Sequence, residues 1–318
     1  MREDDDRPAR HVGPGVPPGA KVMDAAAAVR AFVRPGDVVG LGGQNINRCP
    51  MALVHEIVRQ EPSDLTVVGC NLSLPLDILA AAGLVRRTEQ GSGNLERYGV
   101  LFTWRRLAEA GRIEVADYSH LAMASRFLAG SLGLPHIGVR SLLGTDILVQ
   151  LLAADAARVI NDPWDGQQVV LLRSLTPDVS IIHASRADED GNVVIDGVSS
   201  HEIDMLRASH RAIVTVEQIL PGSSLSADPE AVSVSCAFVD AVVEQPFGAF
   251  PTSVYRYYDY SEAEVQEYQH CSRGGGDDLE AHLSEWIRGV DSFDAYLHKR
   301  DPEGTLRAGL EASMRSLV

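Results

Sequence analysis

Short apolar runs alternate with amphipathic segments along most of the chain. Residues 37–41 and 64–69 are apolar and rich in β-branched side chains, which predicts two buried strands. Between them, residues 50–59 begin with proline and then place leucine, valine and isoleucine at helical spacing, which predicts a helix. A strand, a helix and a strand in this order form a βαβ unit, and such units build parallel sheets.

The same alternation continues toward the carboxyl terminus. Further strands are expected at residues 85–88, 169–172, 179–183, 212–216 and 239–243, and further helices at 23–33, 78–82, 96–110, 121–131 and 145–157. Asp190-Gly191-Asn192 is a hairpin signal, so an antiparallel edge hairpin is expected there. From Tyr260 onward the pattern is mostly helical and acidic. The predicted fold is α/β: a doubly wound, mostly parallel sheet with helices on both faces.

The first twenty residues differ from the rest of the chain. They are charged, and then rich in proline and glycine, so we expect residues 1–20 to be a disordered tail and residues 21–318 to be one domain. No basic start with an apolar middle is present, and no apolar run is long enough to span a bilayer. We therefore expect a cytoplasmic protein that does not bind membranes.

Charge and cysteine usage narrow the possible partners. The formal net charge of -16 argues against nucleic-acid binding, because such a surface would have to neutralise many phosphates. The four cysteines lie far apart, without a Cys-x-x-Cys pair, so we expect inert thiols and neither disulfides nor a metal site. The expected partners are small molecules or other proteins.

Residues 35–45 form the most distinctive segment, Pro-Gly-Asp-Val-Val-Gly-Leu-Gly-Gly-Gln-Asn. Pro35-Gly36 suits a turn, and the glycines after the short strand let bare backbone approach a neighbour or a ligand closely. The spacing matches neither a phosphate loop nor a dinucleotide fingerprint. Since ligands of such sheets bind at the carboxyl ends of the strands, a site is expected at this glycine turn.

A long series of motifs resembles the α subunits of the type I CoA-transferases, above all glutaconate CoA-transferases. The series covers residues 37–43, 48–57, 64–68, 110–113, 117–119, 132–135, 179–184, 190–192, 212–217, 239–243, 247–251 and 258–260, in the order found in the family. The similarity extends over residues 22–300. An ordered series of this length is far more specific than any single motif.

The resemblance implies a heteromeric enzyme that needs a separate β subunit, as a heterodimer or an α2β2 complex, with the active site between the subunits. It implies transfer of CoA between an acyl-CoA thioester and a small carboxylic acid, with coenzyme A as a substrate and no permanently bound cofactor. A glutamate of the β subunit would attack the thioester. Backbone amides near Gly42 and Gly43 would stabilise the oxyanion, although both glycines also suit tight packing of strand on helix.

Several polar residues are candidates to line the same pocket. Gln44 and Asn45 follow the glycines, and transferases of this type usually have an aromatic residue where Gln44 stands, which indicates a more polar acyl group or another reaction. Asn71, Ser92 and Asn94 follow two neighbouring strands and are candidates to hydrogen-bond the substrate; solvated loop residues are the alternative.

Two other functions stay open. Hydrolase-type relatives resemble this chain around Asp117, where an acidic residue could act as a general base for water, so an acyl-CoA hydrolase, including a ring-opening hydrolase, is the alternative activity. A non-catalytic scaffold subunit is the other alternative. His183 and Glu217 both end apolar strands, and we expect structural roles for them: a hydrogen-bonded histidine, and a buried salt bridge or subunit contact.

Overall fold

The strands in the described part of the chain form one large sheet and one small one. The computed structural model describes residues 20–317, so the predicted disordered tail lies, apart from its last residue, outside the described residues. The eight-stranded sheet contains β1 (Val38–Leu41), β2 (Leu65–Leu72), β3 (Val85–Gly93), β4 (Glu114–Asp117), β8 (Val179–Asp188), β9 (Val193–Val194), β10 (Arg211–Leu220) and β11 (Ala241–Glu244).

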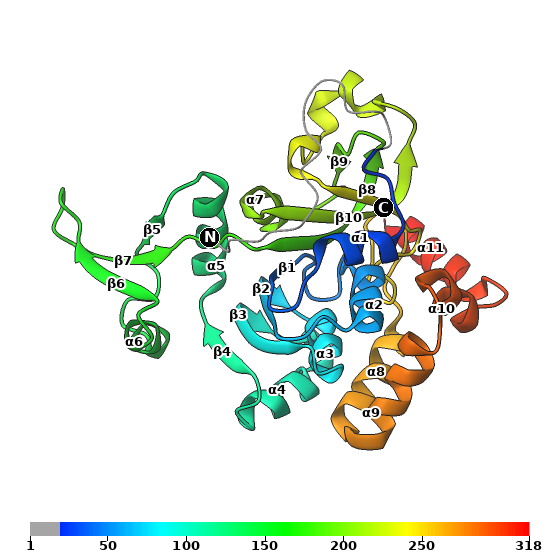
Figure 1. The fold of residues 1–318 in the computed structure, drawn as a ribbon, viewed down its shortest axis with the longest axis horizontal. Coiled ribbons are helices and arrows are strands. Elements are labelled where there is room, and N and C mark those ends of the chain that lie inside the picture. Colours follow the sequence, from blue (N-terminus) through cyan, green and yellow to red (C-terminus); the bar gives the residue numbers. More distant parts are fainter. Residues whose placement is uncertain (1–19, 318) are drawn as a thin grey trace.

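The large sheet is parallel apart from one hairpin. Its order is β11-β10-β8-β1-β2-β3-β4, and every pair along this path is parallel. From β1 the chain builds strands to one side as far as β4, and then returns to place β8, β10 and β11 on the other side (Figure 1). The order therefore reverses between β1 and β8, which is where doubly wound sheets bind ligands.

Strands buried on both faces explain the long apolar runs. Neighbouring residues such as Val67 and Val68, or Ile181 and Ile182, belong to two different core clusters on opposite faces of the sheet. The helices are α1 (Ala25–Phe32), α2 (Met51–Gln60), α3 (Leu74–Ala81), α4 (Phe102–Glu109), α5 (His120–Ser131), α6 (Asp146–Ala153), α7 (Glu202–Ala208), α8 (Glu262–Gly274), α9 (Gly276–Leu283), α10 (Phe293–Arg300) and α11 (Thr305–Leu317).

Helices cover both faces, as predicted. Apolar side chains of α1, α2 and α3 belong to one cluster, which the carboxyl-terminal helices α8 to α10 extend, whereas α5 and α7 contribute to the other. The predicted hairpin is also confirmed: β9 pairs antiparallel with β8, an inner strand, through Arg186↔Val194 and Ala187↔Val193. The doubly wound α/β prediction is confirmed.

The apolar run at residues 169–172 does not join the large sheet. It lies in β7 (Gln168–Arg173), which pairs antiparallel with β5 (His136–Val139) and β6 (Ala157–Asn161) in a separate three-stranded sheet. The helix expected over 145–157 ends at Ala153, because β6 begins at Ala157. Residues 136–173, called the arm below, extend away from the large sheet (Figure 1).

The strand expected at residues 85–88 is longer than predicted, so Ser92 lies within it and not after its end. β3 continues to Gly93, with Gly69 opposite Gln90 and Asn71 opposite Ser92 in the parallel ladder with β2. Gly91 is required there because a Cβ atom would lie 2.6 Å from the carbonyl oxygen of Cys70. The small residues therefore permit close strand packing rather than a turn.

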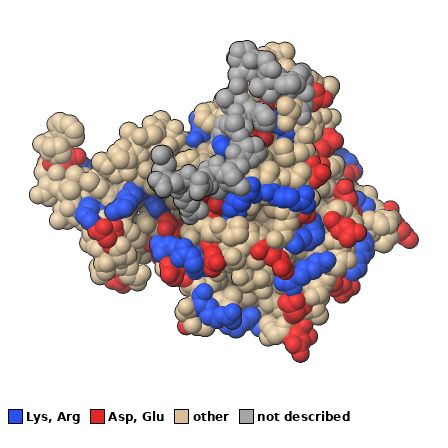
Figure 2. Space-filling view, in the orientation of Figure 1, with Lys and Arg blue, Asp and Glu red and all other residues tan. Residues whose placement is uncertain are grey.

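Two features are absent from residues 20–317. None of the helices described here is long and apolar enough to cross a membrane. Within residues 20–317, no group of three or more histidine, cysteine or acidic side chains is arranged to hold a metal ion. On the face seen in Figure 2, basic and acidic side chains are interspersed.

Candidate active site at the carboxyl edge of the sheet

The two glycines after β1 pack the strand against its neighbours. The Gly42 amide donates to the carbonyl oxygen of Ile181 at 2.9 Å, and the Gly43 amide donates to Oε1 of Glu202 at 2.8 Å. A Cβ atom on Gly42 would lie 2.6 Å from that same Oε1 atom, and Gly43 has φ +87°. Both amides are therefore engaged within the chain, and the oxyanion role expected for amides near Gly42 and Gly43 stays a prediction.

A buried ion pair is hydrogen-bonded to the glycine turn. Arg48 Nη2 lies 2.5 Å from Oε2 of Glu202, and the two side chains are only 3% and 1% exposed. The same guanidinium donates to the carbonyl oxygens of His183 at 3.2 Å and Val198 at 2.6 Å. Glu202 lies on α7, far from Gly43 in the sequence, so no local pattern could indicate that one carboxylate binds both Gly43 and Arg48.

The residues after the glycines form a tight turn that faces the edge of the sheet. Gln44 and Asn47 exchange backbone hydrogen bonds of 2.9 and 3.0 Å, and Gln44 is exposed. Asn45 has φ 55°, and its side-chain Nδ2 donates to Oε1 of Glu96. The Glu96 backbone amide in turn donates to Oδ1 of Asn94 at 2.8 Å. Glu96 thereby brings the predicted site residues Asn45 and Asn94 together.

Asn71 and Ser92 are also hydrogen-bonded to each other, and Ser92 contacts His120, a residue that no sequence pattern had indicated. The Ser92 hydroxyl donates to Oδ1 of Asn71 at 2.8 Å, and Nε2 of His120 lies 2.8 Å from the Ser92 oxygen. Ser119 caps α5 by accepting a hydrogen bond of 3.1 Å from the Ala122 amide, so the helix begins at His120, beside the end of β3. Asn71 is 9% exposed, whereas His120 is exposed.

Asp117 ends β4, opposite Gln90 of β3 in the parallel ladder. Its side chain is exposed, and partial desolvation by its neighbours raises the pKa of the carboxyl group above its usual value. It comes three positions before His120 in the chain. The predicted base and the newly found histidine therefore both follow the carboxyl end of β4.

The expected structural role of His183 and Glu217 is confirmed. His183 is fully buried, with Nδ1 2.8 Å from Oγ1 of Thr215 and Nε2 2.7 Å from Oε1 of Glu217. Glu217 also accepts hydrogen bonds of 2.8 Å from the Tyr258 hydroxyl and from the Phe247 amide. All these polar groups satisfy one another inside the core.

The cysteines are free, as expected. Cys49 and Cys70 are buried, and burial raises the pKa of Cys49 to about 11 and that of Cys70 to about 12. Thiols with such pKa values carry almost no thiolate at neutral pH, so neither has the character of a nucleophile.

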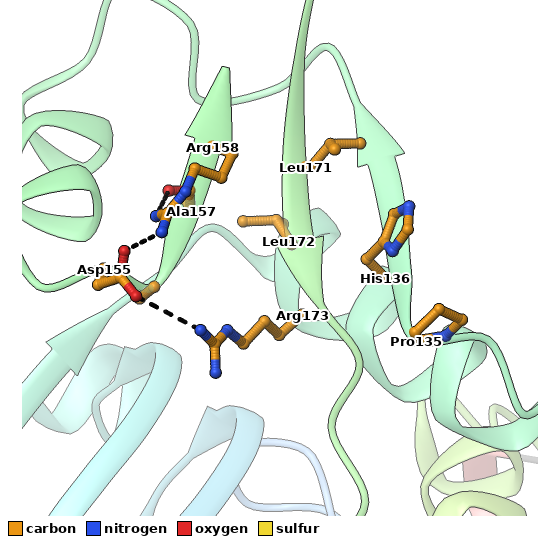
Figure 3. A pocket seen from close by; sticks show the side chains of 9 residues that line it. Pro135, His136, Asp155, Ala157, Arg158, Leu171, Leu172 and Arg173 are labelled. Carbon is orange, nitrogen blue, oxygen red and sulfur yellow. Dashed lines mark hydrogen bonds and ion pairs between the residues drawn. The ribbon is translucent and has the colours of Figure 1, made fainter. Parts of the chain in front are cut away.

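A separate pocket lies in the arm (Figure 3). It is lined by strand residues of the small sheet, including His136, Leu171 and Arg173, and Asp155 pairs there with Arg158 and Arg173. None of its lining residues is a predicted site residue. The polar cluster at the carboxyl edge of the large sheet therefore remains the candidate active site.

The chain is similar to known proteins over most of its length. Residues 22–245 match the family model described as coenzyme A transferase. The A subunit of the glutaconate CoA-transferase of Acidaminococcus fermentans is 31% identical over 88% of this chain and 92% of its own length. The crystal structure of that transferase superposes with a TM-score of 0.85, covering 91% of this chain and 94% of the other.

Relatives with other names are also similar in sequence. The A subunit of the 3-oxoadipate CoA-transferase of Pseudomonas knackmussii is 31% identical over 88% of this chain and 98% of its own length. The cholesterol ring-cleaving hydrolase IpdA subunit of Mycobacterium tuberculosis is 30% identical over 70% of this chain and 78% of its own length. An uncharacterised protein of Archaeoglobus fulgidus is 36% identical over 87% of this chain, which spans only 61% of that protein.

Proposed function

Because the chain belongs to the coenzyme A transferase family, we propose that it is the A subunit of an acyl-CoA:carboxylate CoA-transferase. Its active site is shared with a separately encoded B subunit, which is the β subunit expected from the sequence. The observation that carries this proposal is 31% identity to two transferase A subunits, each spread over 88% of the chain. The polar cluster beside the reversal point between β1 and β8 supports the position of the site.

In the proposed reaction, a glutamate from the B subunit of the complex attacks the thioester carbonyl and expels the CoA thiolate. The thiolate then attacks the glutamate carbonyl of the resulting anhydride, which releases the first acid as its carboxylate and gives an enzyme-bound CoA thioester. The acceptor carboxylate attacks this thioester to form a second anhydride and expels the CoA thiolate, which attacks the acyl carbonyl of that anhydride and releases the glutamate. This covalent route divides one difficult exchange into easier steps and conserves the thioester energy if water is excluded.

This chain contributes one wall of the site. Gln44, Asn45, Asn71, Ser92 and Asn94 supply hydrogen bonds that orient the acyl group, and CoA binds only as a substrate. The buried Arg48–Glu202 pair keeps the glycine turn in one conformation, because Glu202 holds the Gly43 amide. The two transferase relatives are named for glutaconate and 3-oxoadipate, so small dicarboxylic acids are the substrates to test first.

An exposed apolar surface fits contact with the B subunit. On α5, Leu121 is 60% exposed, and Leu128 and Leu132 follow on the same side of the helix at 38% and 63%. Trp164, in the arm, is 90% exposed. The leucine stripe begins next to His120, so a subunit that covers it also reaches the candidate active site. A second copy of this chain is less suited to cover the leucine stripe, because each copy carries a net charge of -16 and two copies would repel each other.

Reconstitution tests the proposal. The chain is co-expressed with the B subunit, and the complex receives glutaryl-CoA with acetate as acceptor, or acetyl-CoA with glutarate. We expect acceptor-dependent exchange with ping-pong kinetics. Borohydride after acyl-CoA treatment should inactivate the enzyme by reducing a thioester on the B subunit. Exchange that requires both substrates bound at once, with no modified glutamate, would overturn the proposed mechanism.

A further inference from the structure

The histidine at the start of α5 has no role in the proposed transfer reaction. We propose that His120 is a general base that activates water, so that the assembled enzyme also hydrolyses its acyl-CoA thioesters. This inference rests on the proposed function, because that function supplies the acyl-CoA site. Three features support it: the tautomer of the ring, the direction of its free nitrogen, and the chemistry that such a nitrogen allows.

Hydrogen bonding fixes the tautomer of His120. The Ser92 hydroxyl has one hydrogen, which it donates to Oδ1 of Asn71 at 2.8 Å. The Ser92 oxygen must then accept from His120, whose Nε2 atom lies 2.8 Å away. Nε2 therefore carries the proton in the neutral ring, and Nδ1 keeps an unshared electron pair.

The packing of the ring turns Nδ1 away from the sheet. The Cδ2 atom of His120 lies 2.5 Å from the position that a Cβ atom on Gly91 would occupy. The ring edge formed by Cδ2 and Nε2 therefore lies against β3, and only a glycine at position 91 leaves room for it. Nδ1 is on the opposite edge of the ring. Since His120 is exposed while Asn71 is 9% exposed, the chain of hydrogen bonds is anchored at its buried end.

A general base accelerates hydrolysis, in which water must lose a proton, but it does not accelerate CoA transfer to a carboxylate. In transfer, the attacking groups are carboxylates and a thiolate, which are already deprotonated. In hydrolysis, the water oxygen forms a bond to the thioester carbon while one water proton passes to Nδ1 of His120. The C–S bond then breaks, and the departing CoA sulfur takes that proton from Nδ1. The products are the free acid, which ionises in solution, and CoA as its thiol.

The test compares two rates in the complex with the B subunit. CoA release from glutaryl-CoA without acceptor measures hydrolysis, and exchange with acetate measures transfer. His120→Gln keeps an N–H donor for Ser92 but lacks a base, and His120→Ala leaves space for added imidazole. We expect both variants to lower the ratio of hydrolysis to transfer by about a hundredfold or more. Imidazole should restore hydrolysis in His120→Ala but not in His120→Gln.

Control variants distinguish His120 from other candidate bases, above all Asp117. His136→Ala removes an exposed histidine in the arm and should leave both rates unchanged. Nitrogen-15 spectra should show the Nε2–H tautomer for His120, and Ser92→Ala should abolish that preference. Loss of hydrolysis in Asp117→Asn together with an unchanged ratio in both His120 variants would assign the base to Asp117. A wild-type complex that transfers CoA but does not hydrolyse the thioester would overturn the inference alone; a complex that does neither would overturn the proposed function.

Discussion

Removal of the Glu202 carboxylate should destabilise the protein strongly. In Glu202→Ala, Arg48 remains at a site where its side chain is 3% exposed, and the Gly43 amide loses its acceptor at 2.8 Å. Breaking a buried ion pair by removing one partner costs about 3–5 kcal/mol, because the remaining charge is left without compensation. Since about 1.36 kcal/mol corresponds to a factor of ten, the folding equilibrium should fall by between about 160-fold and about 4,700-fold.

A surface pair of the same type provides the control. Arg105 and Glu109 lie 2.7 Å apart on α4, but their side chains are 57% and 64% exposed. Glu109→Ala should therefore cost only about 0.3–0.5 kcal/mol, because water screens the pair and replaces it. The distances of the two pairs are nearly equal, so a larger loss in Glu202→Ala reflects the burial of its carboxylate and the Gly43 amide that this carboxylate binds.

Urea unfolding measures both variants, followed by tryptophan fluorescence and by far-ultraviolet circular dichroism. Coincident transitions justify a free energy of unfolding for each variant. Arg48→Met combined with Glu202→Ala should be less destabilised than the sum of the single variants by about 2 kcal/mol or more, since no buried charge remains. A loss in Glu202→Ala within about 1 kcal/mol of that in Glu109→Ala would show that the buried pair does not stabilise the fold in this way.

Three further predictions concern other parts of the molecule. Burial lowers the pKa of His55 well below its usual value. Below about pH 6.5 the unfolded chain therefore binds a proton that the folded chain does not, and the free energy of unfolding decreases as the pH is lowered. His55→Phe should weaken this loss in urea midpoints measured from about pH 7.5 to about pH 5.5; an unchanged slope would contradict it. Ellman's reagent at about pH 8 should spare Cys49 and Cys70 in the native chain and reach them after unfolding, whereas rapid native labelling of either would contradict their burial. Leu128→Glu should weaken association with the B subunit at least tenfold by calorimetry while leaving the unfolding midpoint of the isolated chain unchanged; equal affinity would remove α5 from the interface.

The sequence predicts the sheet well because most of its strands are buried on both faces. Runs such as 64–69 and 212–216 contain apolar residues at consecutive positions, and the structure places them in β2 and β10. The glycine turn was likewise found from local residues, since Gly43 has φ +87°. Signals that depend only on neighbouring residues are therefore recovered.

What the sequence could not reveal depends on contacts between distant segments. The length of β3 is set by its ladder with β2, which outweighs the loop preference of Gly91 and Gly93. The small sheet of the arm forms because β7 pairs with β5 and β6 and not with a strand of the large sheet.

The candidate site shows the same limit. Glu202 is brought to Gly43 by the packing of α7, and His120 is brought to Ser92 by the start of α5. A single histidine before an apolar helix carries no local signal of this contact. The predicted residues Asn71 and Ser92 do lie in contact, because the ends of adjacent parallel strands meet at one edge of the sheet. Their role in substrate binding stays a prediction.

The most direct test of a site shared between two subunits is CoA exchange measured for this chain by itself, for the B subunit by itself and for the two together. We expect that only the mixture exchanges CoA between an acyl-CoA and a free carboxylate, and that borohydride then labels the B subunit. Full exchange by the isolated chain would contradict it.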